Sequence, residues 1–600
     1  MAASRNDQIV MEALTLLNSG DEAKAKQLLE GVLKRQPTHP QGAKLLAMIH
    51  GGHEEDDKAL IFLQRSIIGD PTDGETRFML GNVLLGLKRH KEAAAAYREA
   101  LRIAPGNVAA SDGLGKCLIS LGRYQEAITV FRAAINANPD NPDPYGNMGG
   151  ALVTIAKMEE ALAVADEGLR RMPGNAALLE FAAYTMNFPR GTDHAAIKDL
   201  HVRFGQALVA ASNRPEPAFR RSPDPDRPLR VGFLSGDFAF HACAMFMKAP
   251  LLNFNHDDIQ PVCFSTVRQT DGGDAPFKSA CEWRNIDSRD PAEVAASILS
   301  ADLDILIDCS GLTEGHRLGA LVPRVAPIQC TWLGYPNTTG LPSMDYRIVD
   351  WLTDPQGSEC QATERLIRLP GCFLCYTPPE NAPPPTPTRA ALDPDAPITF
   401  GSFNRMTKVT PAALDAWAQI LRRVPNSRLL LKLRIPSEEL RQDAVALFEK
   451  RGIEGSRIQM MPFLKHSRDA AAMYAEMDIA LDSFPYNGTT TTCEATWMGV
   501  PVITLEGDSH RSRVGVSLNS VLGLRDLIAA TPADYIETAV RLSADRSSLA
   551  DFKASLRNRM AASPLCDAPA YAAKFAAALR GIWRAWCAQR SRERQGTSPT

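Results

Sequence analysis

Long hydrophobic runs, a large excess of one charge and a second CxxC cysteine pair are all missing from this sequence of 600 residues. Because no stretch of about 18 residues is uniformly apolar, we expect no membrane-spanning helix. The N-terminal segment MAASRNDQIVMEAL lacks the apolar core of a signal peptide, so a cytoplasmic location is expected. The net charge of −3 gives no electrostatic reason to expect nucleic acid or an acidic membrane as a partner.

The twelve cysteines are scattered along the chain and form one CxxC pair, Cys372 and Cys375. No second pair follows at a spacing that would complete a zinc site. We therefore interpret these cysteines as free thiols, which fits a reducing compartment.

The overall composition is typical of a soluble globular protein, with 45% apolar and 22% charged residues. Since domains usually contain about 100–200 residues, the chain is long enough for three or more of them.

A 34-residue repeat runs through the first part of the chain. The residues in register are Pro37, Pro71, Pro105, Pro139 and Pro173; Ala25, Ala59, Ala93, Ala127 and Ala161; and Gly81, Gly115 and Gly149. This period is that of the tetratricopeptide repeat, a pair of helices in which a small residue lies at the helix contact and a proline ends the unit. We therefore predict a superhelix of about five repeats over residues 1–190.

Stacked repeats form a curved solenoid, and its concave face commonly binds an extended peptide. We expect the repeats to bind a protein partner through that face. The alternatives are a spacer and a dimerisation arm, the latter making the protein a homodimer.

Two proline-rich segments divide the rest of the chain. Residues 191–228 are predicted to form a linker, and residues 378–387 separate two regions in which strand-like and helix-like segments alternate. The alternation predicts two mostly parallel sheets covered by helices, over residues 229–385 and 391–585, before a disordered tail at 586–600. The expected strands begin at Leu229, Gln260, Leu303, Ile328, Tyr346, Ile398, Arg428, Ile479 and Pro501, and helices are expected at 291–300, 415–423, 470–477 and from 495.

The stretch LDSFPYNGTTTTCE, residues 481–494, places four threonines between a predicted strand and a predicted helix. Free backbone N–H groups and the positive end of the helix dipole point outward at such a position. One threonine suffices to cap a helix. Four threonines after Gly488, which permits close backbone approach, indicate a phosphate site.

Two cations are expected near this phosphate site. Lys408 and Arg405 lie in the loop that follows the strand beginning at Ile398. A lysine and a helix terminus together would stabilise a diphosphate leaving group without a metal.

Several segments of the chain carry a specific resemblance to one family. Residues 229–585 resemble the catalytic region of the protein O-GlcNAc transferase / SPINDLY family, inverting glycosyltransferases of the GT-B type, and lie closer to its SPINDLY-like branch. The resemblance implies a tetratricopeptide α-solenoid followed by two Rossmann-like α/β domains. It is carried by GFLSGDFAFH (232–241), APIQCTWLGYPNTTGLPSMDYRIVD (326–350), LPGCFLCYTP (369–378), GSFNRMTKVTP (401–411), LDSFPYNGTTTTCEATWMGVPVITL (481–505) and VGVSLNSVLGL (514–524).

The resemblance also implies roles for individual residues. Lys408 corresponds to the lysine on the donor diphosphate, Glu494 to a carboxylate on the ribose, and His241 to a histidine proposed as the base, a role that suits its pKa. Donor phosphate contacts are expected from Arg405, Thr489, Thr490, Thr491 and Thr492. The loop beside the sugar and the acceptor is expected to contain Gly334, Tyr335, Pro336, Asn337, Thr338 and Thr339.

Three features bear on the donor and on metal use. The animal enzymes have a glutamine where this chain has Arg405, and many members have a histidine at the position of Ala470, with His466 four residues earlier here. Asp302 and Asp304 form an Asp-x-Asp pattern like that of metal-dependent glycosyltransferases. Because this pattern begins an apolar strand, we expect no metal.

The sequence therefore predicts a protein O-glycosyltransferase that moves one sugar to serine or threonine with inversion. UDP-GlcNAc is the first choice of nucleotide-sugar co-substrate, GDP-fucose the second, and a flagellin-type enzyme with another nucleotide sugar the third. A non-catalytic scaffold and an enzyme acting on lipid or polysaccharide are the alternatives of other classes.

Overall fold

The computed structural model describes residues 4–189, 193–219, 221–267, 271–385, 387, 393, 395–432, 438–461 and 471–594. The chain divides into two compact units, Met1–Leu178 and Leu179–Thr600. None of the helices in the described ranges has the length and apolar character needed to cross a membrane.

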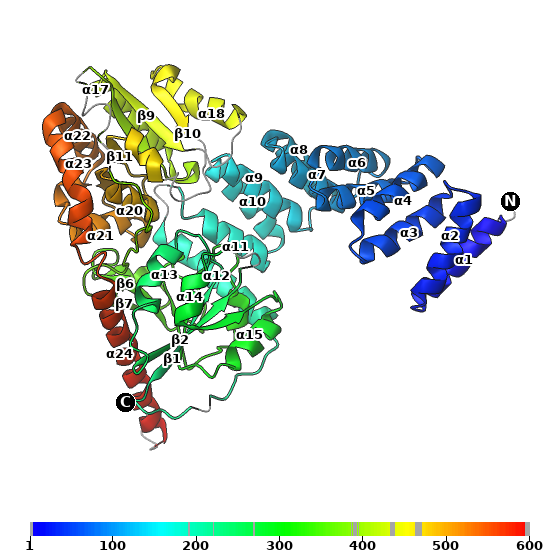
Figure 1. Ribbon diagram of the computed structural model, residues 1–600, viewed down its shortest axis with the longest axis horizontal. Coiled ribbons are helices and arrows are strands. Elements are labelled where there is room, and N and C mark those ends of the chain that lie inside the picture. Colours follow the sequence, from blue (N-terminus) through cyan, green and yellow to red (C-terminus); the bar gives the residue numbers. More distant parts are fainter. Residues whose placement is uncertain are drawn as a thin grey trace. The chain divides into compact units, whose positions relative to one another are not determined.

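The first unit is a succession of helices, each packed against its neighbour in the chain (Figure 1, blue to cyan). The helices form five consecutive pairs, and α11 begins at the end of the unit. They are α1 Arg5–Asn18, α2 Glu22–Arg35, α3 Pro40–Gly52, α4 Asp56–Gly69, α5 Gly74–Gly86, α6 His90–Ile103, α7 Val108–Ser120, α8 Tyr124–Ala137, α9 Asp143–Thr154, α10 Met158–Arg171 and α11 Ala176–Thr185.

The repeated residues have the structural roles that the 34-residue period predicts. Each of the five prolines follows the second helix of a pair, as Pro37 follows α2. The five repeated alanines are fully buried. A Cβ atom added at Gly81 or Gly115 would clash with the ring of Tyr97 or Phe131. The predicted helical-repeat architecture is confirmed.

A seven-stranded sheet forms the first half of the second unit. Its strand order is β3-β2-β1-β4-β5-β6-β7, and all neighbouring strands are parallel. The strands are β1 Leu229–Ser235, β2 Ile259–Ser265, β3 Glu282–Asn285, β4 Ile305–Asp308, β5 Ile328–Thr331, β6 Tyr346–Asp350 and β7 Arg365–Leu369. The helical elements are α12 His194–Ala211, α13 Ala244–Leu251, α14 Ala275–Ala280, α15 Pro291–Leu299, η1 Leu318–Leu321 and η2 Ser358–Gln361.

A second parallel sheet follows, with the order β10-β9-β8-β11-β12-β13. Its strands are β8 Ile398–Ser402, β9 Ser427–Lys432, β10 Ile458–Met461, β11 Ile479–Leu481, β12 Val502–Leu505 and β13 Ile528–Ala529. Its helices are α17 Pro411–Arg423, α18 Glu438–Glu449, α20 Thr490–Trp497, α21 Val514–Val521, α22 Pro532–Ala544, α23 Arg546–Ala561 and α24 Ala568–Arg594. Its 3-10 turns are η3 Met406–Lys408, η4 Gly455–Arg457, η5 Met473–Glu476, η6 His510–Ser512 and η7 Arg525–Leu527.

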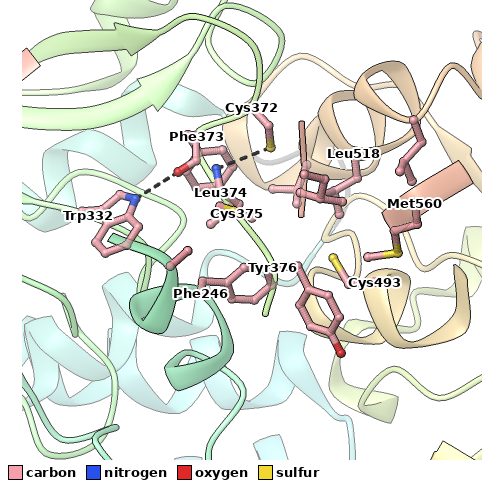
Figure 2. Packing of buried hydrophobic residues seen from close by; sticks show 14 of the residues in the cluster. Phe246, Trp332, Cys372, Phe373, Leu374, Cys375, Tyr376, Cys493, Leu518 and Met560 are labelled. Atoms are coloured by element: carbon pink, nitrogen blue, oxygen red, sulfur yellow. Dashed lines mark hydrogen bonds between the residues drawn. The ribbon is translucent and has the colours of Figure 1, made fainter. Parts of the chain in front are cut away.

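One hydrophobic core connects the two halves of this unit (Figure 2). The segment 372–376 packs on Phe246 and Trp332 from the first half, and the indole of Trp332 donates a hydrogen bond to the carbonyl of Phe373 (3.1 Å). Cys493 and Leu518 from the second half belong to the same cluster. The two predicted Rossmann-like domains are present and share a core.

Two predictions about local structure were wrong. The expected linker contains helix α12, because Ile197 and Phe204 give it a buried apolar face. The expected disordered tail is helical through Arg594, because Trp583 and Cys587 of α24 are buried. The segment expected to be a helix at 470–477 is helical over 471–476, with α-helical residues 471–472 followed by the 3-10 turn η5, and Ala470 and His466 lie outside the described residues.

Candidate active site

Each sheet has one point at which the direction of strand order reverses. β1 lies between β2 and β4 in the first sheet, and β8 lies between β9 and β11 in the second. Residues 236–243 follow β1, Lys408 follows β8 and the threonine run follows β11. Ligands of open parallel sheets bind outside the carboxyl ends of the strands at such points. The topology thus brings the predicted site residues to the ligand-binding ends of both sheets.

The four threonines lie at the N-terminus of α20. Thr489 is the N-cap residue, Thr490 is the first helical residue, and the Thr489 side chain makes no capping hydrogen bond. The Thr491 hydroxyl donates to Asn404 Oδ1 (2.9 Å), and Thr492 is buried. The first backbone N–H groups of a helix have no partner within it. The threonine run is therefore more than a simple side-chain cap.

The buried carboxylate of Asp482 holds the turn that precedes these threonines. It accepts hydrogen bonds from the Gly488 amide (2.7 Å), the Asn404 side chain (3.1 Å) and the Thr504 hydroxyl (3.0 Å). Burial raises the pKa of Asp482 to about 6, and these hydrogen bonds and the Lys408 charge oppose that rise. Asp482 therefore fixes the loops after β8 and β11 relative to each other.

Lys408 is a partly buried cation next to the threonine helix. Its Nζ donates to the Asn487 carbonyl (2.9 Å) and lies 3.8 Å from the centre of the Tyr486 ring. Burial lowers the pKa of Lys408 to about 7, with Asp482 opposing and Arg405 adding to the decrease. In the described part of the chain, no carboxylate lies within salt-bridge distance of its Nζ. An anionic ligand would supply the missing counter-charge.

Arg405 lies near both Lys408 and the loop that follows β1. Its side chain is exposed at the start of η3. Burial raises the pKa values of Asp237 and Cys243, and the positive charge of Arg405 opposes both increases. Arg405 therefore lies near residues of the first sheet as well as near Lys408.

His241 forms a compact group with two other side chains of its own loop. Its Nδ1 lies 3.2 Å from Asp237 Oδ1 and accepts a hydrogen bond from the Cys243 amide (3.3 Å). The His241 side chain is 43% exposed, whereas that of Asp237 is 12% exposed. The arrangement gives the imidazole a carboxylate neighbour on one edge and solvent access.

Glu494 lies in the first turns of α20, directly after the threonines, and is partly buried. The Tyr474 hydroxyl donates to its Oε2 (3.1 Å), and the Tyr474 ring packs 4.7 Å from the ring of Phe403. Burial raises the pKa of Glu494, and the positive charge of Lys432 opposes the increase. The Tyr474 hydroxyl therefore holds one oxygen of this carboxylate in place.

The side chains of the predicted sugar loop point mostly into the protein. Tyr335 is buried, and its hydroxyl accepts a hydrogen bond from the Asn187 side chain (2.7 Å) and donates one to His201 Nε2 (2.8 Å), because His201 Nδ1 donates to the Ile197 carbonyl. Thr338 and Thr339 are fully buried and donate to Glu364 at 2.6 and 2.5 Å. These three side chains therefore hold the loop in place through hydrogen bonds inside the protein.

Other members of the loop have different constraints. The Asn337 side-chain amide donates to the side-chain oxygen of Asn187 (3.1 Å). Gly334 approaches Cys309 so closely that an added Cβ would clash with the Cys309 carbonyl. Gly334, Pro336 and Asn337 are the partly exposed residues of the loop.

Sequence reasoning missed several residues that complete the site. They are Asp237, Cys243, Asn404, Asp482, Tyr486 and Asn487, and Arg511, whose buried guanidinium donates to the Met186 carbonyl (2.9 Å). Most of these follow a central strand directly. Polar residues at that position were the available signal.

The Asp-x-Asp pattern proves to be structural. Asp304 is fully buried and accepts hydrogen bonds from the Arg227 guanidinium (2.7 Å) and the Arg230 amide (2.8 Å). The Arg227 guanidinium already compensates the negative charge of Asp304, so this carboxylate is poorly suited to bind a metal ion.

Comparison with known families gives an independent view of this arrangement. The model of glycosyl transferase family 41 matches residues 183–377 and 385–575, more than half of the chain. The chain belongs to glycosyl transferase family 41. A tetratricopeptide-repeat model also matches residues 84–145 and 118–183. The match to family 41 is interrupted at residues 378–384, in the proline-rich segment between the two sheets.

Plant proteins are among the relatives within this family. The chain is 40% identical over 370 residues to the protein named probable UDP-N-acetylglucosamine--peptide N-acetylglucosaminyltransferase SPINDLY of Arabidopsis thaliana. It is 43% identical over 370 residues to the SPINDLY protein of Eustoma exaltatum, and 28% identical over 369 residues to SEC of Arabidopsis thaliana. Each SPINDLY alignment covers 61% of this chain and 40% of the relative. The chain thus matches well under half the length of these relatives.

A solved structure of the family matches more completely. An O-GlcNAc transferase mutant of Thermobaculum terrenum superimposes with a TM-score of 0.78 at 30% identity, covering 86% of this chain and 98% of that one. The resemblance to the family that the sequence indicates, closer to its SPINDLY-like branch, is confirmed, since the identity is 40% to SPINDLY of Arabidopsis thaliana and 25% to the UDP-N-acetylglucosamine--peptide N-acetylglucosaminyltransferase of Caenorhabditis elegans.

Proposed function

We propose that this protein transfers a single sugar, GlcNAc from UDP-GlcNAc, to serine or threonine of protein acceptors, with inversion and without a metal. The observation that carries the proposal is Lys408, a partly buried cation beside the N-terminus of α20 at the reversal point of the second sheet. The names of the family relatives support the choice of donor.

The donor diphosphate would bind between Lys408 and the start of α20. Its negative charge would interact with the lysine and with the free N–H groups of the helix, and a charge-assisted hydrogen bond is stronger than a neutral one. The hydroxyls of Thr489 and Thr490 would add donors, Thr491 would contribute its backbone N–H because its hydroxyl donates to Asn404 Oδ1, and Arg405 would contribute positive charge. The same groups stabilise the diphosphate as it leaves, which lowers the barrier of the chemical step.

The nucleoside would lie on the Glu494 side of the helix. Glu494 Oε2 is bonded to Tyr474, so Oε1 would accept a ribose hydroxyl. Thr492 is buried in the helix and would support the turn without touching the donor.

The acceptor hydroxyl would approach from the His241 side. Its oxygen attacks the anomeric carbon while the carbon–oxygen bond to the diphosphate breaks and its electron pair passes to that diphosphate. Nδ1 of His241 would give up the hydrogen bond from the Cys243 amide and carry its proton toward Asp237 Oδ1, 3.2 Å away. In that tautomer Nε2 has a free lone pair and would take the hydroxyl proton, and Asp237 would stabilise the imidazolium. Attack opposite the leaving group inverts the anomeric centre.

The loop at 334–339 would shape the sugar site mainly through its backbone and Pro336. Its buried threonines are bonded to Glu364, so they would hold the loop in position. The helical repeats of the first unit would select the protein acceptor, as peptide binding by stacked repeats suggests.

A transfer assay tests this function. The full chain is incubated with soluble cell proteins and labelled UDP-GlcNAc, or with GDP-fucose, and alkali-labile sugar on protein is measured. We expect transfer from UDP-GlcNAc, with a loss of about 10²–10³-fold in Lys408→Ala and none in the exposed control Lys450→Ala. Full activity of Lys408→Ala would contradict the mechanism, and transfer from GDP-fucose alone would change the donor.

A further inference from the structure

Three potential metal ligands converge in the loop after β1. Asp237, His241 and Cys243 each offer one ligand atom, and these three atoms lie within 4.8 Å of one another. Within the described ranges, this is the one group of three or more such residues that meets this criterion. The mechanism proposed above uses His241 and Asp237 but gives the Cys243 thiol no role.

The spacing of these atoms is close to that of a tetrahedral zinc site. With Zn–N, Zn–O and Zn–S bonds of about 2.0–2.3 Å, ligand atoms in a tetrahedral site are about 3.4–3.6 Å apart. The observed distance from His241 Nδ1 to Asp237 Oδ1 is 3.2 Å. The Cys243 Sγ lies within 4.8 Å of the ligand atoms of the other two residues. A cation would therefore have to draw the thiol closer by up to about 1.2 Å to reach tetrahedral spacing.

The loop that carries the ligands is held in place by its own hydrogen bonds. The Asp237 amide donates to Ser235 Oγ (3.0 Å), and the Phe240 amide donates to the Asp271 carboxylate (3.0 Å). Cys243 is the N-cap residue of α13. Fixing the ligands in advance reduces the entropy that binding must overcome.

We propose that Asp237, His241 and Cys243 form a binding site for a thiophilic divalent cation of the Zn²⁺ class. Thiolate and imidazole ligands favour Zn²⁺ and similar ions, whereas Mg²⁺ and Ca²⁺ require oxygen ligands. Three protein ligands and the exposed edge of His241 leave the fourth coordination position to water.

The surrounding charges set the strength of this site. Glu314 adds negative charge close to Asp237, and Arg405 adds positive charge close to both Asp237 and Cys243. Removing the Arg405 charge should therefore tighten cation binding, since Coulomb repulsion between the guanidinium and the ion is lost.

A cation bound at this site would prevent His241 from acting as the base. This consequence rests on the function proposed above. A neutral imidazole that binds a cation through Nδ1 carries its proton on Nε2. His241 Nε2 then has no lone pair to accept the proton of the acceptor hydroxyl. The cation would act as an inhibitor of transfer rather than as a cofactor.

Cobalt binding tests the site without reference to activity. Co²⁺ is added to the purified full chain, and thiolate-to-cobalt charge-transfer absorption is recorded in the near ultraviolet. We expect a band that saturates at one ion per chain, that Zn²⁺ abolishes by competition and that Mg²⁺ leaves unchanged. In Cys243→Ser the band should disappear, and Zn²⁺ affinity measured by calorimetry should fall by about tenfold or more.

Matched variants make the result decisive. Cys360→Ser removes an exposed thiol elsewhere and should retain the band, while Arg405→Gln should strengthen Co²⁺ binding. The melting temperature of Cys243→Ser shows whether the variant is folded, since serine keeps a donor toward Asp237. No band in the wild type, or an unchanged band in Cys243→Ser, would overturn the proposal.

The activity arm separates the two proposals. Zn²⁺ should inhibit wild-type transfer and inhibit Cys243→Ser at least about tenfold less, each relative to its own metal-free rate. A cobalt band in a protein that transfers no sugar would leave the cation site standing and refute the proposed function. Transfer without a cobalt band would refute the cation site alone.

Discussion

The low pKa of Lys408 predicts that donor affinity falls steeply with pH. Only the protonated lysine supplies a charge to the diphosphate, and its pKa in the free protein is lowered to about 7. The protonated fraction is then about 0.9 at pH 6, about 0.1 at pH 8 and about 0.01 at pH 9. Since apparent affinity scales with the competent fraction, the Kd for UDP-GlcNAc should rise about tenfold from pH 6 to 8 and about tenfold again by pH 9.

Isothermal titration calorimetry of UDP-GlcNAc binding measures this dependence. The donor's phosphates do not titrate between pH 6 and 9. Titrations at pH 8 in buffers of different ionisation enthalpy should also show uptake of about 0.9 proton per donor bound. Asp482, whose pKa is raised to about 6, is mostly ionised above pH 7, so the upper half of the profile reports on Lys408.

The variant Lys408→Arg provides the matched control, because arginine remains charged across this range. Its profile between pH 7 and 9 should be flat. The stability of the ligand-free protein should depend on pH in the opposite sense. Between pH 7 and 10.5 a lysine in the unfolded chain binds more protons than Lys408 does in the folded protein, so the contribution of Lys408 makes the free energy of unfolding rise with pH. A wild-type Kd that is constant from pH 7 to 9 would refute the assignment of Lys408 to the diphosphate.

Three further substitutions test the geometry. In Gly488→Ala the new Cβ would clash with Thr491 Oγ1, so donor Kd measured by calorimetry should rise by about tenfold or more. Glu364→Gln weakens the hydrogen bonds that hold the loop at 334–339; it should cost about 1.5–3 kcal/mol and lower the melting temperature with little change in donor Kd. Gly115→Ala would clash with the Phe131 ring and should destabilise the helical repeats by about 1–3 kcal/mol in a circular-dichroism melt.

Two glycines provide controls for the alanine substitutions. A Cβ added at Gly146 or Gly581 meets no atom within 4 Å. Alanine at these helical positions should be neutral or stabilise by up to about 1 kcal/mol. Donor affinity unaffected by Gly488→Ala, or a repeat melt unaffected by Gly115→Ala, would contradict the packing described above. A large loss of donor affinity in Glu364→Gln would assign the loop a direct role in donor binding.

The central strands of both sheets could be predicted, whereas all four edge strands were missed. β1 and β8 are continuous apolar runs because both faces are covered. The strands β3, β7, β10 and β13 form the four edges. They are short or polar, as the sequence EWRN of β3 illustrates, because an edge strand is half exposed.

The candidate site shows a similar division. Lys408 and the threonine run could be found because they lie within one strand–loop–helix segment each. The hydrogen bond from Asn404 to Asp482 joins residues 78 positions apart, so local pattern does not reveal it. The resemblance to the family identified the loop at 334–339 but could not show that Tyr335 and Thr338 point inward, because that depends on Asn187 and Glu364.

Thermal stabilisation by nucleotides tests the central claim most directly. UDP, GDP and CMP are compared with wild-type protein and with Lys408→Ala, with and without EDTA. A nucleotide at 100 times its Kd should stabilise the protein by about 2.7 kcal/mol. The account predicts stabilisation of the wild type by UDP, unchanged by EDTA and largely lost in Lys408→Ala. No stabilisation by any nucleotide, or equal stabilisation of both proteins, would contradict a diphosphate site at Lys408 and α20.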